Sequence, residues 1–132
     1  MRETIRDITL TIDGSPTGFR LSKLDAFSGA VLLRLALRLE QKQAAFSILD
    51  LVSSLSEEEL RSVMRTCLNH TEVLLPAGPN PVMTGNEWGW PELEHDTVAC
   101  MTLTVESIAW SLSGFFDEGG RNSPPARSDT AP

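Results

Sequence analysis

Hydrophobic and polar residues alternate near the N-terminal end of the chain, which is typical of a half-buried β-strand. The alternation with threonine is strict from Ile8 to Ile12, and it resumes at Phe19-Arg20-Leu21. The intervening residues 13–18 are rich in turn formers. The pattern predicts a β-hairpin over residues 4–22, with strands at about 4–12 and 18–22. Two strands alone are marginally stable in water, so the hairpin must pack against another element.

Four later segments place apolar residues at helical spacing. Ser22 or Asp25 is a candidate N-cap for the first helix, and Asp96 for the last. Ser56 followed three residues later by Glu59 is a capping box for the third. The predicted fold is mainly α, with the hairpin packed on a small bundle of about four helices. Their expected ranges are about 25–41, 44–55, 57–70 and 97–116.

The segment between the third and fourth helices carries no periodic pattern. Its first residues, 73–75, are apolar and could form a strand fragment. Three prolines follow within residues 76–81, and proline lacks a backbone N–H donor. We therefore expect a long loop over residues 76–91. We expect one domain over residues 1–117 and a disordered tail over 118–132, where large apolar residues are missing.

The chain is acidic, and the acidity is uneven. It has 18 acidic and 11 basic residues, for a net charge of −7. Residues 1–65 carry nine of each sign, whereas residues 66–132 carry nine acids and two arginines. This balance argues against non-specific binding to nucleic acid or to an anionic membrane. No apolar run is long enough to span a membrane. The mixed charges at the N-terminus do not resemble a signal peptide, so we expect a cytoplasmic protein.

No group of residues has the spacing of a known catalytic or metal site. The two histidines are far apart, so we expect neither a metal nor a cofactor. Cys67 precedes His70 by one helical turn, but it lies on an apolar stripe, which favours a buried free thiol. Glu92, Glu94 and Asp96 precede a helix, whose dipole favours acids there. The sequence therefore predicts a binding or assembly protein and not an enzyme.

Two features suggest a surface for a partner. Trp88 and Trp90 lie in the Pro/Gly-rich loop, where tryptophans either cap the core or anchor a partner. The last helix has a single charged interior residue, Glu106. It is therefore either the central helix of a bundle or a helix with apolar surface left for another chain.

Five segments succeed one another in a recognisable order. The strand segment Ile8–Gly14 leads into Phe19–Phe27, and Leu32–Leu35 continues as a Leu/Arg-rich helix. Leu55–Leu60 then opens a helix, and Ile108–Phe116 closes the pattern on an aromatic pair. Over residues 5–117 this order resembles that of the phage tail assembly chaperones, small proteins made with the tail genes of tailed phages and prophages.

The resemblance implies a protein of the host cytoplasm that binds the tape measure protein and keeps it soluble for tail tube assembly. The resemblance also makes the tail tube protein a second candidate partner, and it leaves self-association open. The alternatives are a structural component of the virion, such as a tail completion or connector protein, and a small acidic inhibitor of a host factor. The expected partner contacts are Trp88, Trp90, Trp110, Phe115 and Phe116, with Arg34, Arg38 and Lys42 as a second, weaker surface.

Overall fold

A computed structural model describes residues 3–43 and 45–113 of the chain. Four strands form an antiparallel sheet in the order β1-β2-β3-β4, and two short strands, β5 and β6, form a separate hairpin. The strands are β1 (Ile5–Ile12), β2 (Ser15–Ser22), β3 (Thr71–Leu75), β4 (Gly78–Pro81), β5 (Met83–Thr84) and β6 (Glu87–Trp88). The helices are α1 (Ala26–Glu40), α2 (Ile48–Ser53), α3 (Glu57–Asn69), the 3-10 turn η1 (Pro91–Leu93) and α4 (Thr97–Ser111).

The prediction of a mainly α, nearly all-alpha fold is wrong. Strands make up 26% of the structure and helices 48%, so the protein has an α+β fold. The sheet contains a second hairpin, β3–β4, where the sequence suggested a strand fragment and a long loop. The two hairpins form one continuous sheet because β2 pairs with β3.

The prolines of β4 explain why this strand was missed. Pro79 and Pro81 alternate with Asn80, which lies opposite Val73 of β3. The backbone nitrogens of Pro79 and Pro81, which carry no hydrogen, therefore point to the same hydrogen-bonding side of the strand. Because β4 is the last strand of the sheet, that side faces no neighbouring strand, and proline is tolerated there.

The first hairpin turns more tightly than predicted. Its loop is only Asp13-Gly14, and both residues have positive φ angles, 51° and 83°. A two-residue Asp-Gly turn matches the natural twist of the two strands. The second strand consequently begins at Ser15 and not near residue 18.

The helix starts follow the local capping signals. Asp25, Ser56 and Asp96 cap α1, α3 and α4, and the Ser56–Glu59 capping box has both of its hydrogen bonds. The second helix is shorter than the predicted range 44–55, because Ser47 caps it and it ends at Ser53. Helix α4 ends at Ser111, with Leu112 as its C-cap, and so is shorter than the predicted range 97–116. Residue 116 itself and the predicted tail 118–132 lie outside the described residues.

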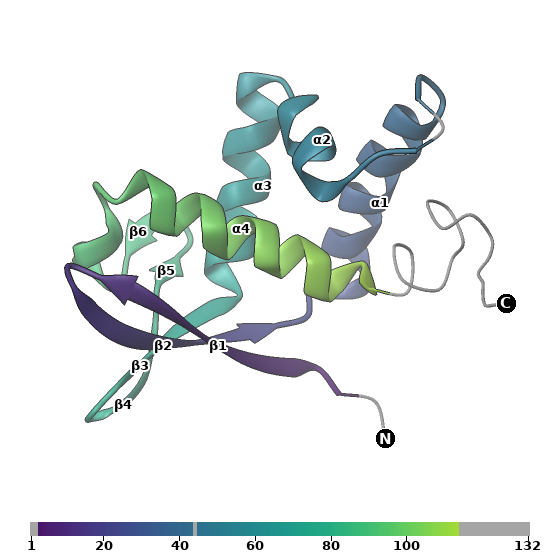
Figure 1. The fold of residues 1–132 in the computed structure, drawn as a ribbon. Coiled ribbons are helices and arrows are strands. Elements are labelled where there is room, and N and C mark those ends of the chain that lie inside the picture. The colour runs from purple at the N-terminus through teal and green to yellow at the C-terminus, as the bar shows by residue number, and fades with distance from the viewer. Residues whose placement is uncertain (1–2, 44, 114–132) are drawn as a thin grey trace, which may run out of the picture.

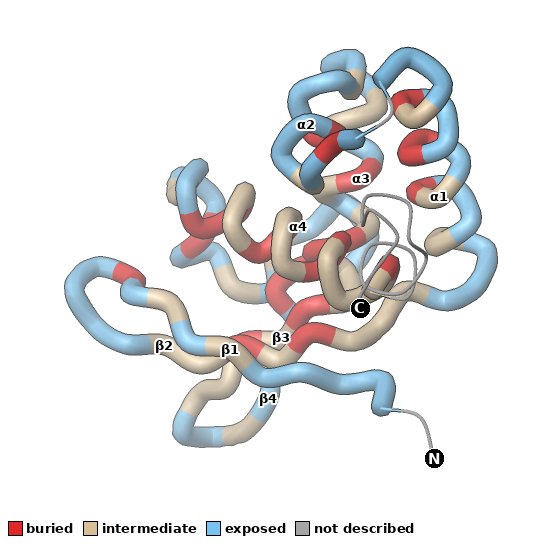
Figure 2. The backbone as a smooth tube through the Cα atoms, turned by 45° about the vertical axis from the view of Figure 1, so that its right-hand side comes forward, coloured by how far each residue is buried: buried red, intermediate tan, exposed pale blue. Residues whose placement is uncertain are grey.

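Helix α4 is the central element of the structure. Figure 1 shows it between the sheet and helices α2 and α3, and its residues contact both layers. Leu103 belongs to a cluster of buried side chains with Phe19 and Val73 of the sheet, the sheet cluster. Ile108 belongs to a second cluster with Leu35 of α1 and other residues of α1–α3, the helix cluster. Figure 2 shows the buried residues of α4 against those of both layers.

Candidate functional site

The β5–β6 hairpin and the turn after it hold the two neighbouring tryptophans. Gly89, between them, donates its N–H to the Val82 carbonyl over 2.9 Å, and its own carbonyl accepts from Asn80 Nδ2 over 3.0 Å. A Cβ at Gly89 would collide with the Pro81 carbonyl oxygen, so the close approach of this backbone requires glycine. Trp88 and Trp90 are therefore fixed in place, and both are half-buried against the sheet cluster.

Trp90 and Trp110 make contacts within the chain. The Trp90 ring meets Phe19 edge-on, with ring centroids 6.0 Å apart. The Lys23 ammonium lies 4.6 Å from the centre of the Trp110 ring, and Trp110 Nε1 donates to the Thr4 carbonyl over 3.4 Å. These contacts favour core capping for Trp90 and Trp110 over the role of partner anchors.

Trp88 instead lines a groove of about 480 Å³ between α3 and the start of α4. Met64 and Leu68 of α3, Met83 of β5 and Cys100 of α4 contribute its apolar side chains. Such a floor of methionine and tryptophan adapts to apolar side chains of different shape. The remaining lining residues are Arg61, Arg65, Glu94, Asp96 and Thr97. We call this cavity the Trp88 groove.

Asn69, the last residue of α3, positions the β5–β6 hairpin beside that helix. Its Oδ1 accepts from the Gly85 N–H over 2.6 Å, and its Nδ2 donates to the Gly85 carbonyl over 3.0 Å. Gly85 has a φ of +61°, which glycine adopts without strain. These two bonds bring Met83 and Trp88 to the α3 surface. Met64, Met83 and the groove could not be predicted from the sequence, because contacts between distant residues, such as Asn69 with Gly85, bring them together.

The two sides of the Trp88 groove carry opposite charges. Arg61 pairs with Glu57 one turn earlier on α3, over 2.7 Å, while Asp96 caps α4 by accepting from the Ala99 N–H over 3.0 Å. Within the described part of the chain, the exposed side chains of Arg65 and Glu94 make no ion pair. These two charges are therefore available to a bound partner.

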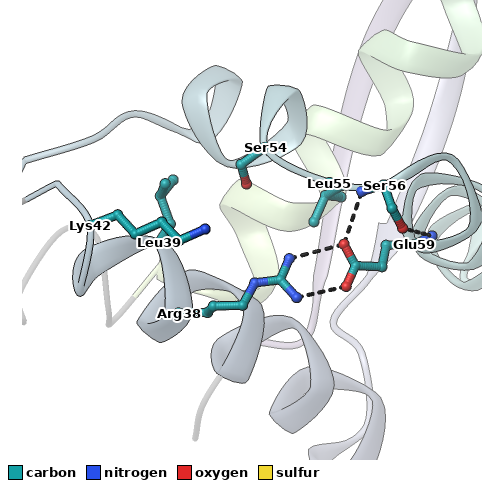
Figure 3. A pocket seen from close by; sticks show the side chains of 7 residues that line it. All are labelled: Arg38, Leu39, Lys42, Ser54, Leu55, Ser56 and Glu59. Carbon is teal, nitrogen blue, oxygen red and sulfur yellow. Dashed lines mark hydrogen bonds and ion pairs between the residues drawn. The ribbon is translucent and has the colours of Figure 1, made fainter.

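The predicted basic stripe is not a uniform surface. Arg38 donates to both carboxylate oxygens of Glu59, over 2.7 and 2.9 Å, and so joins α1 to α3 (Figure 3). Arg38 and Lys42 line a cavity of about 410 Å³ beside this pair, whereas Arg34 is not among its lining residues. The structure thus places Arg38 in an interhelical contact and leaves Arg34 and Lys42 exposed.

Glu59 is held in its ionised form. The Arg38 guanidinium, with help from the Ser56 N–H, lowers the pKa of Glu59 to about 2. The same ion pair raises the pKa of Arg38. Bidentate Arg–carboxylate contacts of this kind combine charge with fixed geometry. The Arg38–Glu59 pair therefore fixes α1 against the start of α3.

The two cysteines are buried free thiols, as predicted. Burial raises the pKa of Cys67 to about 11 and also raises that of Cys100, so both favour the unreactive thiol form. The His70 ring contacts the Thr66 carbonyl through Nδ1 and lies 3.6 Å from Asp25 through Nε2. In residues 3–43 and 45–113, no group of His, Cys, Asp and Glu side chains could hold a metal ion. Phe115 and Phe116 lie outside the described residues.

Comparison with known proteins finds no matching family model, no similar curated protein and no matching solved structure. Among the described helices, none is both long and apolar enough to cross a membrane.

Proposed function

We propose that this protein is a tail assembly chaperone of a tailed phage or prophage. It binds the tape measure protein non-covalently in the host cytoplasm and keeps that client soluble until tail tube subunits assemble around it. The observation that carries the proposal is the Trp88 groove, a cavity of about 480 Å³ in which apolar side chains lie between charged ones on a fixed scaffold. The order of sequence features that resembles this family supports the same function.

The physical requirements of such a protein agree with the groove. A long helical client with exposed apolar stripes aggregates through those stripes, and a groove with adaptable apolar side chains can cover them. Met64, Met83 and Trp88 supply those side chains. The net charge of −7 helps to keep a complex in solution.

The test is co-expression with the tape measure protein encoded beside this gene, followed by measurement of the soluble client fraction. We expect the native protein to raise that fraction. Trp88→Ala, which removes the largest apolar group of the groove, should lower it. Leu49→Ala is the matched control, because Leu49 is 64% exposed on α2, is not among the groove-lining residues, and should leave the client soluble.

Two results would contradict the proposal. One is a client that is equally insoluble with and without the native protein. The other is the presence of this protein in stoichiometric amount in purified particles, as detected by mass spectrometry, because a structural component would remain there and a chaperone would not. Far-UV circular dichroism of the Trp88→Ala variant separates loss of the groove from loss of the fold.

A further inference from the structure

The charges around the Trp88 groove restrict what can bind there. Arg61 and Arg65 lie on the α3 side, and Glu94 and Asp96 lie on the side of α4. A ligand with one sign of charge on both of its flanks would meet repulsion on one side. Charge complementarity therefore favours a ligand with opposite charges on its two flanks.

The lining of the groove favours a helix over an extended strand. Addition of a strand requires a sheet edge, and β5 and β6 offer only two residues each. The rest of the lining is side chains of α3 and of the segment entering α4. On α3 the lining runs from Arg61 to Leu68, a distance of roughly 10 Å, which equals about two turns of a docked helix.

We infer that the Trp88 groove binds one amphipathic helix of a partner protein, its apolar stripe on the half-buried side chains of Met64 and Trp88. The acidic flank of that helix lies beside Arg65, and its basic flank lies beside Glu94. The inference rests on the proposed function, since it describes the client segment that a chaperone would hold. It adds that the opposite charges on the two sides of the groove determine in which of two directions the partner helix lies there.

The experiment uses three synthetic helical peptides of roughly four turns with the same leucine stripe. One has a glutamate flank and a lysine flank, the second has lysine on both flanks, and the third has glutamate on both. Their affinities for the full chain are measured by fluorescence anisotropy at physiological salt. The mixed peptide should bind about fivefold more tightly than either of the others, the effect expected from one or two exposed ion pairs.

Variants of the two unpaired charges make the test specific. Glu94→Arg makes the unpaired charge basic on both sides, while Asp96 stays acidic, and should shift the preference toward the all-glutamate peptide. Arg65→Glu makes the unpaired charge acidic on both sides, while Arg61 stays basic, and should shift the preference toward the all-lysine peptide. Both side chains are exposed, so neither change should alter folding. Arg34→Glu is the matched control, because it changes the net charge as Arg65→Glu does, but away from the groove.

The net charge of −7 by itself predicts that the all-lysine peptide binds the native protein best. That result, an unchanged order of affinities in the variants, or no binding of any peptide would overturn the inference. The client assay is independent of these results. If the client stays soluble while the peptides show no preference, only the charge inference fails. If the peptides behave as expected while the client precipitates, the proposed function fails.

Discussion

Replacing Leu103 with alanine tests whether α4 joins the two halves of the core. Leu103 is 0% exposed and packs in the sheet cluster. The change removes three carbon groups, which costs about 2.5 kcal/mol at about 0.8 kcal/mol for each buried group. A cavity enclosed by the sheet adds to this transfer cost, so we expect a total loss of about 3–4 kcal/mol.

The assay is urea unfolding followed by far-UV circular dichroism and by tryptophan fluorescence. Val98→Ala is the control on the same helix, because Val98 is 75% exposed, and it should change the free energy of unfolding by less than about 0.5 kcal/mol. Both signals should shift together, since α4 belongs to both clusters. A loss below about 1 kcal/mol for Leu103→Ala, or two separate transitions in the native protein, would refute this account of the core.

Three further predictions follow from local contacts. The pKa of Glu59 is lower in the folded state, about 2 against its usual 4.5, so its contribution to stability is present above about pH 4.5 and is lost as the pH falls toward 2. Glu59→Gln should therefore make urea unfolding less dependent on pH across that window, and an unchanged dependence would contradict it. Cys67 and Cys100 should react with a thiol reagent at least about tenfold more slowly in the native protein than in urea, because both are buried; equal rates would show exposed thiols. Gly89→Ala should lower the melting temperature, because its Cβ would clash with backbone, whereas Gly29→Ala, in open space on α1, should stabilise the protein by about 0.5–1 kcal/mol. Scanning calorimetry measures the melting temperatures of the two variants. A higher melting temperature for Gly89→Ala than for Gly29→Ala would contradict the structure.

Features that depend on neighbouring residues could be predicted from the sequence. The start of α3 is one, because the two hydrogen bonds of its capping box join residues only three apart, Ser56 and Glu59. The strict alternation from Ile8 to Ile12 is another, and it falls within β1. Such signals report local geometry and do not depend on the rest of the fold.

Features that depend on distant residues could not be predicted in the same way. Proline is unfavourable in most strands, so Pro79 and Pro81 argued against a strand at β4. The sheet order shows that β4 is an edge strand, where proline is tolerated. The Trp88 groove depends on the contact between Asn69 and Gly85. Of the residues that line the groove, Trp88 alone was predicted as a partner contact, and the pattern behind that prediction did not distinguish it from Trp90.

The pairing of β2 with β3 sets the order in which the protein can form. The two strands are neighbours in the sheet, but the whole segment α1–α3 lies between them in the chain. During synthesis, Phe19 and Leu21 are made long before Val73, their neighbour in the sheet cluster, and long before α4 covers them. Such non-local pairing slows folding and prolongs the time for which apolar strands are exposed. The nascent chain therefore passes through a stage in which its own apolar strands are exposed and prone to aggregate, a hazard of the kind that we propose it prevents in its client.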